Sequence, residues 1–277
     1  MKTALVTGTS SGFGRGVVTA FLARGYTVYA TLRRAGERKT LFADEQQAHG
    51  ERLVVLDLDV TDAGARAAAV ARVGGRLDCL VNNAGYALFG ALEDTSEDEL
   101  RAQLEVNLFG AALLTRDLLP ALRGATGSII NVSSVFGYAG FPLTSAYCAS
   151  KYALEGFSEA LWLELRPHGV RVHLVEPGGH RTGFASNVEW ASGSSPTYAV
   201  ATAAYRAFKD RLEKKEGNSP AGVVRKIVEL ADVPSSRLRV PVGADAHATA
   251  WLKRLPQGIA LAAWDGMVGR IFAGATA

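Results

Sequence analysis

Short apolar runs alternate with longer amphipathic stretches along most of the chain. Seven runs predict β-strands, and the first six are almost continuously apolar, as expected for strands covered on both faces. They are Ala4–Val6, Thr27–Thr31, Leu53–Leu58, Leu77–Val81, Ser128–Val132, Val170–Val175 and Arg239–Val242. The amphipathic stretches between them predict helices, among them Gly14–Arg24, Asp62–Val73, Glu97–Leu122 and Tyr147–Arg166.

This alternation predicts an α/β fold, a single-domain Rossmann-type doubly wound parallel sheet of about seven strands with helices on both faces. We expect residues 1–245 to form one domain, and residues 246–277 to form a C-terminal helical extension packed on it. The segment Phe184–Thr197 is rich in Ser and Gly. It is either an inert surface loop or a possible lid over a pocket.

Composition narrows the class of protein. The 277 residues are 48% hydrophobic and 21% charged with a net charge of +3, which suits a globular chain, and no basic cluster indicates nucleic-acid binding. Cys79 and Cys148 lie in apolar patterns, so neither a disulfide framework nor a cysteine-zinc site is expected. No apolar run reaches the roughly 18 residues of a membrane span, and the first strand leaves no room for a signal peptide. We expect a soluble, cytoplasmic protein.

A glycine-rich segment, Thr7–Gly14, follows the first strand and opens the first helix. Gly8 can make the tight turn, Gly12 admits a pyrophosphate close to the backbone, and Gly14 permits close helix–strand contact. The helix N-terminus offers free N–H groups to that anion. The segment lacks the Lys-Ser/Thr ending of an ATP-type loop, so it favours a dinucleotide over a nucleoside triphosphate.

The end of the second strand favours NADP over NAD. An acidic residue there would bind the ribose 2′-hydroxyl of NAD, whereas an arginine accommodates the 2′-phosphate of NADP. This sequence has Arg33 and Arg34 just beyond the strand and no acid at its tip. The alternative is a solvated arginine pair with no ligand. The glycine-rich segment upstream favours the phosphate interpretation, above all for Arg33.

Candidate proton-transfer chemistry lies at the start of the helix Tyr147–Arg166. Tyr147 and Lys151 are four residues apart and so share one helix face. The ordinary phenol pKa of about 10 makes tyrosine a poor base, and a nearby cation lowers it. Ser134 follows the strand Ser128–Val132, where a hydroxyl would reach the ligand crevice. Tyr-x-x-x-Lys alone is common on protein surfaces. The pair indicates a catalytic site only together with Ser134 and the glycine-rich segment.

Taken in order, these motifs closely resemble the short-chain dehydrogenase/reductase family over residues 1–245, which are then the dinucleotide-binding catalytic domain. Within it, Tyr29–Arg33 and Tyr147–Gly156 look most like the 17β-hydroxysteroid/retinol dehydrogenase branch. The residues that carry the resemblance are Thr7–Gly14, Asp59, Val60, Asn82, Asn83, Ala84, Gly85, Asn107, Ser134, Tyr147, Lys151, Pro177, Gly178 and Thr182.

The resemblance implies four catalytic roles. Tyr147 would be the general acid/base, and Lys151 would lower the pKa of Tyr147 and hold the nicotinamide ribose. Ser134 would bond the reacting oxygen, and Asn107 would position a water in a proton relay.

The same resemblance implies an NADP(H) site. Asp59 and Val60 would flank the adenine, and Pro177 to Thr182 would cover the nicotinamide. His180 replaces the small apolar residue usual in the family, and either faces solvent or alters the substrate mouth. The five histidines form no ligand spacing, so no metal is expected. The implied cofactor-binding residues are Gly8, Ser10, Ser11, Gly12, Phe13, Gly14, Leu32, Arg33, Asp59, Val60, Asn83, Ala84, Gly85, Val132, Tyr147, Lys151, Pro177, Gly178, His180 and Thr182.

We therefore expect an NADP-dependent oxidoreductase that acts on CH–OH groups, a carbonyl reductase or alcohol dehydrogenase, with Ser134, Tyr147 and Phe184 contacting the substrate. One alternative is a catalytically silent dinucleotide-sensing or scaffold protein, and another is an epimerase or dehydratase of the same family. A homodimer or homotetramer is expected through the two long helices. A bulky lipophilic or aromatic substrate would suit apolar residues that are either pocket lining or ordinary core, namely Phe89, Leu92, Phe136, Phe141, Leu143, Phe184 and Trp190.

Overall fold

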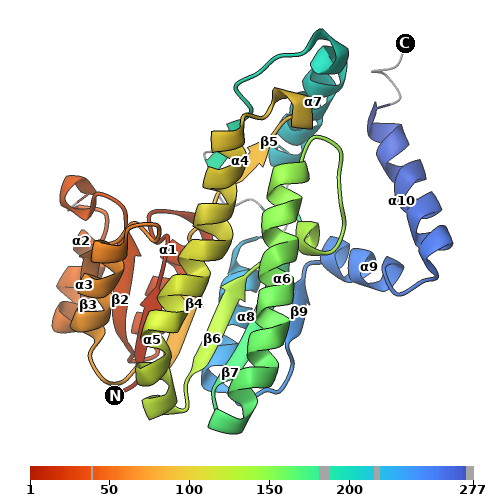
Figure 1. The fold of residues 1–277 in the computed structure, drawn as a ribbon. Coiled ribbons are helices and arrows are strands. Elements are labelled where there is room, and N and C mark those ends of the chain that lie inside the picture. Colours follow the sequence, from red (N-terminus) through yellow and green to blue (C-terminus); the bar gives the residue numbers. More distant parts are fainter. Residues whose placement is uncertain (39, 181–186, 215–218, 273–277) are drawn as a thin grey trace.

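The computed structural model describes residues 1–38, 40–180, 187–214 and 219–272. Seven strands form one parallel sheet in the order β3-β2-β1-β4-β6-β7-β9 (Figure 1), which confirms the predicted doubly wound fold. The strands are β1 (Thr3–Val6), β2 (Thr27–Leu32), β3 (Leu53–Asp57), β4 (Cys79–Asn82), β6 (Ser128–Val132), β7 (Arg171–Pro177) and β9 (Arg239–Val242).

The strand order reverses at β1, and this reversal positions the site. β1 pairs with β2 on one side, with Leu5 opposite Tyr29, and with β4 on the other, with Leu5 opposite Leu80. The crossover helices leave on opposite faces at such a point, so a crevice opens beyond the carboxyl ends of the strands. Ligands of doubly wound sheets bind in that crevice.

Helices cover both faces of the sheet (Figure 1). On one face, α1 and α8 bury Val17, Phe21 and Ile227 completely, and on the other α5 buries Leu114 and Leu118 beside α3 and α6. The helices are α1 (Gly12–Ala23), α2 (Ala43–His49), α3 (Ala63–Val73), α4 (Glu97–Leu104), α5 (Ala111–Ala125), α6 (Ser145–Leu165), α7 (Ala199–Lys214), α8 (Ala221–Asp232), α9 (Ala244–Leu252) and α10 (Gln257–Phe272).

The helix predicted over Glu97–Leu122 is divided by a π-helical turn. α4 begins at a capping box in which Ser96 and Glu99 bond each other's backbone N–H groups. A π-helix then runs over Glu105–Gly110 before α5 continues. Apolar periodicity does not reveal such a turn, because the apolar positions resume on the far side of it.

A small second sheet was not predicted. β5 (Ala87–Phe89) and β8 (Val188–Trp190) pair in parallel, with Phe89 opposite Trp190. Three-residue strands are too short for alternation to signal them. Val188–Trp190 belong to the segment predicted to be a surface loop or a lid, so part of that segment is a strand. Residues 184–186 of the segment lie outside the described residues.

Beyond β9 the chain forms α9 and α10 (Figure 1). α10 packs against α7. The Trp264 indole N–H donates to the Gly140 carbonyl at 2.5 Å, and the ring lies edge-on to Phe141 with centroids 6.4 Å apart. The division into two parts at residue 245 stays a prediction.

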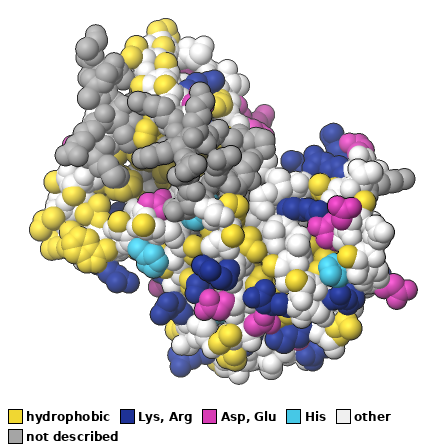
Figure 2. All heavy atoms as spheres, turned by 180° about the vertical axis from the view of Figure 1, so that it is seen from behind, with side chains coloured by type: hydrophobic (Ala, Val, Ile, Leu, Met, Phe, Trp, Pro, Cys, Tyr) yellow, Lys and Arg dark blue, Asp and Glu magenta, His cyan; other side chains and the backbone are white. Residues whose placement is uncertain are grey.

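On the face shown in Figure 2, Lys and Arg side chains are interspersed with Asp and Glu.

Backbone strain at the end of α5 yields the first prediction. Thr126 lies at φ 49° and ψ 45°, in the left-handed region that β-branched residues avoid, whereas Gly25 at φ 81° has no atom within 4 Å of an added Cβ. We expect Thr126→Gly to raise the free energy of unfolding by roughly 0.5–1 kcal/mol, and Gly25→Ala to lower it by roughly the same. Urea titration measures both. An unchanged Thr126→Gly midpoint would contradict the strain.

Candidate active site

Two glycines shape the loop between β1 and α1. Gly8 has φ +68° and Gly12 has φ +57°, both in the left-handed region that glycine adopts without strain. A Cβ on Gly8 would also lie 2.8 Å from the Cα of Ala84. The side chain of Ser11, at the N-cap of α1, accepts no helix N–H bond, so the first turn of α1 has no side-chain cap. An anion can therefore use those N–H groups.

Asn83 ties this loop to the end of β4. Its Nδ2 donates to the carbonyl oxygens of Thr7 at 2.8 Å and Gly8 at 3.0 Å. A Cβ on Gly14 would collide with that Gly8 oxygen and lie 2.6 Å from the amide nitrogen of Asn83. The expected close contact at Gly14 is thus made with the loop itself and Asn83 rather than with the strand. Thr7, at the start of the loop, bonds the same segment in return: its Oγ1 accepts the backbone N–H groups of Asn83 and Ala84, each at 2.9 Å. The sequence did not indicate this role of Thr7.

Arg33 and Asp59 lie at the ends of adjacent strands, β2 and β3. Burial opposes the ionisation of Asp59, but hydrogen bonds from Thr61 and the charge of Arg33 outweigh it and hold the pKa of Asp59 below its ordinary value. Arg33 itself is exposed. Leu32, also expected at the cofactor, is buried in the core at the end of β2. Arg33 is thus the residue whose side chain can reach a ligand.

Ser134 and Tyr147 meet at the carboxyl edge of the sheet. Ser134 lies two residues beyond the end of β6 and caps a short 3-10 turn, its Oγ accepting the N–H of Phe136 at 3.2 Å. Tyr147 lies in the first turn of α6, is 5% exposed, and forms a side-chain hydrogen bond with Ser134. Burial raises the pKa of Tyr147 above its ordinary value, and the bond with Ser134 only partly opposes this. The expected lowering of that pKa is therefore wrong for the protein alone, because burial dominates.

Lys151 lies one turn further along α6. Its Nζ is 5.8 Å from the centroid of the Tyr147 ring and donates to the Val132 carbonyl at 2.9 Å. Lys151 is 7% exposed, and burial lowers the pKa of its ammonium to about 8, against the opposing charge of Glu155. At neutral pH Lys151 is still mainly a cation.

Asn107 lies in the π-helix and is 2% exposed. Its Nδ2 donates to the Tyr86 carbonyl and to the Ser150 hydroxyl, both at 3.0 Å, and its Oδ1 accepts the Tyr86 N–H at 3.2 Å. A Cβ on Gly85 would be 2.8 Å from Asn107 Oδ1 and 4.0 Å from Lys151 Nζ. Asn107, Gly85 and Lys151 thus meet beside Tyr147. Ser150, which the sequence analysis did not single out, connects them by donating to the Tyr147 carbonyl at 2.7 Å.

Aromatic rings surround Tyr147. Phe136 and Phe89 approach it edge-on, with centroids 5.8 and 6.1 Å away, and Leu143 belongs to the same cluster. Leu92 is 65% exposed and is not among the cluster's residues. The other rings are Phe141, Trp190, Tyr205 and Phe208. The last two come from α7, where no sequence signal marked them.

The chain after β7 returns to the glycine-rich loop. Gly179 N–H donates to Asp245 Oδ2 at 2.6 Å, and His180 lies edge-on to Phe13 with centroids 5.7 Å apart. His180 therefore contacts the loop between β1 and α1. Thr182 and Phe184, expected at the cofactor and the substrate, lie outside the described residues.

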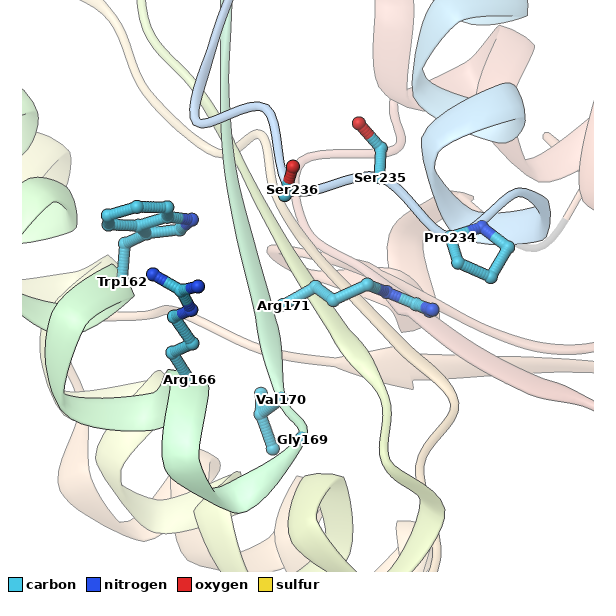
Figure 3. Close-up of a pocket in the computed structure, with 8 residues that line it drawn as sticks. All are labelled: Trp162, Arg166, Gly169, Val170, Arg171, Pro234, Ser235 and Ser236. Atoms are coloured by element: carbon cyan, nitrogen blue, oxygen red, sulfur yellow. The ribbon is translucent and has the colours of Figure 1, made fainter.

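A cavity of about 290 Å³ lies elsewhere, between the end of α6 and the segment before β9 (Figure 3). Trp162, Arg166, Arg171 and Ser235 are among its lining residues, and Arg171 is the first residue of β7. It is thus at the amino end of the strand whose carboxyl end carries the site. Among the described residues, no group of three His, Cys, Asp or Glu side chains could hold a metal, and no helix is long and apolar enough to cross a membrane.

The uncapped helix N-terminus at a glycine-rich loop and the buried Ser-Tyr-Lys group at one crevice define a dinucleotide-binding oxidoreductase of the α/β class. The family model for short chain dehydrogenases matches residues 2–192. The chain belongs to the short-chain dehydrogenase family, as its motifs predicted.

Two curated relatives represent the similarity in sequence. The chain is 38% identical over 220 residues to a 3-ketodihydrosphingosine reductase of Bacteroides thetaiotaomicron, covering 77% of each chain. It is 34% identical over 249 residues to human retinol dehydrogenase 8, covering 86% of this chain and 80% of that one. The second match supports the predicted branch.

Two solved structures share the fold. A short-chain dehydrogenase from Streptomyces avermitilis is 37% identical with a TM-score of 0.83, covering 98% of this chain and 99% of that one. A short-chain dehydrogenase from Burkholderia cenocepacia in complex with NADP is 28% identical with a TM-score of 0.75, covering 97% and 99%.

The crowding at Gly14 gives the second prediction. We expect Gly14→Ala to weaken dinucleotide affinity at least about tenfold, because its Cβ would displace the Gly8 carbonyl and Asn83, and with them the loop. Titration of cofactor fluorescence measures this. Gly36→Ala is the matched control, since a Cβ there meets no atom within 4 Å. Equal affinities for the two variants would contradict the role of the loop.

Proposed function

We propose that this protein is an NADP(H)-dependent oxidoreductase that reduces a ketone or aldehyde to an alcohol, with Tyr147 as the general acid/base. The observation that carries the proposal is the contact of the buried Tyr147 phenol with Ser134, beside the Lys151 ammonium. All three groups are intact, which disfavours the catalytically silent sensor. Among the residues that the structure describes, no feature of the site favours the alternative of an epimerase or dehydratase.

The protonation states suit reduction. Because burial raises the pKa of Tyr147, the phenol keeps its proton at neutral pH and can donate it to a carbonyl oxygen. Ser134 then serves as the second hydrogen-bond donor to that oxygen as its negative charge grows. Oxidation of an alcohol would need the phenolate, which the buried environment disfavours. Lys151, with an ammonium pKa of about 8, supplies the nearby positive charge.

The residues proposed to bind the cofactor lie at the same edge of the sheet. Bound NADPH would supply the hydride. The α1 N-terminus would hold the pyrophosphate, Asn83 to Gly85 would line the cofactor, and Asn107 would order a water near Lys151. Arg33 is exposed at the end of β2, where it can pair with a 2′-phosphate. The NADP bound in the Burkholderia relative supports this choice.

A bulky lipophilic or aromatic substrate is supported by the rings around Tyr147 and by the two relatives, whose names denote a sphingoid ketone and retinol. Apolar walls with a few polar groups are typical of such sites. A homodimer or homotetramer through α5 and α6 is supported by apolar side chains exposed near and on these helices, Phe109 (45%), Tyr152 (45%) and Leu163 (60%). The cytoplasmic location stays a prediction.

Tyr147→Phe is the direct test. Loss of the donated proton should lower kcat/KM by about 10³-fold or more while NADPH affinity changes little, since only the hydroxyl is removed. NADPH consumption at 340 nm against aryl ketones, steroids, retinal and small aldehydes measures turnover. Tyr152→Phe, on the exposed side of the same helix, is the control. Retained activity in the Tyr147→Phe variant would exclude this acid.

Arg33→Ala tests cofactor choice. Removing a guanidinium from a phosphate should weaken NADPH binding roughly 10- to 100-fold and leave NADH binding unchanged. Arg34→Ala is the comparison variant, because Arg34 is the other exposed arginine just beyond β2, and a smaller loss of NADPH binding is expected there than in Arg33→Ala. An unaltered NADPH/NADH ratio in the Arg33→Ala variant would assign the 2′-phosphate to another residue.

A further inference from the structure

A second group of charged side chains, two of them buried carboxyls, begins one helical turn beyond Lys151. Glu155 is one helical turn beyond Lys151 on α6, Glu176 lies on β7 next to Pro177, and Arg239 begins β9. Glu155 and Glu176 are only 3% and 2% exposed. The proposed reaction does not use them directly, and buried carboxyls need a reason to be there.

Arg239 connects the carboxyls. Its Nη1 pairs with Glu155 Oε2 and lies 3.4 Å from Glu176 Oε1, and its Nη2 lies 2.8 Å from Glu159 Oε2. Glu159 is on the next turn of α6, with its side chain 59% exposed. One face of α6 therefore presents Lys151, Glu155 and Glu159 in succession toward β6, β7 and β9.

The two buried carboxyls cannot both ionise easily beside one guanidinium. Burial and the charge of Glu155 raise the pKa of Glu176 to about 8, and its hydrogen bond with Glu155 adds to this rise. Burial raises the pKa of Glu155 as well, against a hydrogen bond with Ser133 and the charge of Arg239. Because Arg239 Nη1 lies nearer to Glu155 than to Glu176, we assign the negative charge of the pair to Glu155 and the shared proton to Glu176.

Lys151 and Glu155 are both buried and lie one helical turn apart on one face of α6. Burial lowers the pKa of the Lys151 ammonium, and the charge of Glu155 opposes this lowering. The other groups around it are neutral: the Val132 carbonyl from β6, the Tyr147 phenol from its own helix, and the Asn107 amide from the π-helix. From β7 and β9, protonated Glu176 and the cation Arg239 are engaged with Glu155.

We propose that Glu155, held by Arg239 and Glu176, is a positioning residue: it is the counter-ion that keeps the buried Lys151 charged beside Tyr147. This inference rests on the proposed function, in which Lys151 acts as a cation. Burial favours the neutral amine of Lys151, and Glu155 opposes it. Without Glu155 the pKa of Lys151 falls further, so Lys151 loses its proton at a lower pH.

The test is Glu155→Gln, which removes the charge and keeps the shape. NMR titration of lysines labelled with ¹³C at Cε should show Lys151 titrating roughly one pH unit or more lower than in the unaltered protein. The high-pH limb of kcat/KM should move down by the same amount. Glu159→Gln is the matched control, since it removes an exposed partner of the same arginine, and both profiles should stay in place.

An unchanged Lys151 titration in folded Glu155→Gln protein would overturn the proposal, as would an equal shift in Glu159→Gln. If Glu155→Gln does not fold, Glu155→Asp serves instead. The shorter side chain places the carboxylate one methylene farther from Lys151, so a smaller downward shift of the Lys151 titration is expected. A titration of Lys151 identical to that in the unaltered protein would overturn the proposal.

The titration needs neither substrate nor cofactor, so the two proposals can fail separately. A Lys151 shift in a protein that turns over no carbonyl compound would overturn the proposed reaction and support the counter-ion. Carbonyl turnover with no Lys151 shift would do the reverse.

Discussion

The cost of burying an ammonium group organises the carboxyl edge of this sheet. Lys151 is nearly inaccessible to water, and a cation there is stable only where dipoles or opposite charges replace the lost hydration. The end of β6 supplies one replacement, the Val132 carbonyl, and α6 supplies another, Glu155. Both require α6 to lie against β6 and β7 in one register. The position of the Lys151 ammonium beside Tyr147 thus depends on the packing of that helix on the sheet.

At the same edge of the sheet, the end of β4 holds the glycine-rich loop in place. Asn83, at the end of β4, uses its side chain to bond two successive carbonyls of the loop, while Thr7 bonds the backbone of Asn83 in return. These reciprocal bonds lock the turn without a side chain that would occupy the space for a pyrophosphate. The positive φ of Gly8 is what allows that turn.

The sequence predicted those features of the fold and of the site that depend on the local pattern of residues. Apolar runs located all seven strands of the main sheet, and helix spacing put Tyr147 and Lys151 on one face. Contacts between distant segments were not readable: β8 pairs with β5 about a hundred residues earlier in the chain, and Arg239 meets Glu155 from another strand. The predicted direction of the pKa shift of Tyr147 was wrong for the same reason. The spacing of Tyr147 and Lys151 reveals the nearby cation, but the burial of the phenol depends on the three-dimensional fold.

The π-helix at Glu105–Gly110 has a geometric consequence for the two helices it joins. Each α-helical residue advances about 100° around the axis, so a turn with one additional residue changes the angular phase of everything after it. α4 can therefore present Glu99 to the segment after β8, where it accepts the N–H of Ser192 at 2.9 Å, while α5 directs Leu114 and Leu118 into the sheet. A continuous α-helix without the π-helical turn could not direct both sets of side chains in these two orientations. Asn107 stands where the phase changes, and its amide contacts both the Tyr86 backbone and α6 as a result.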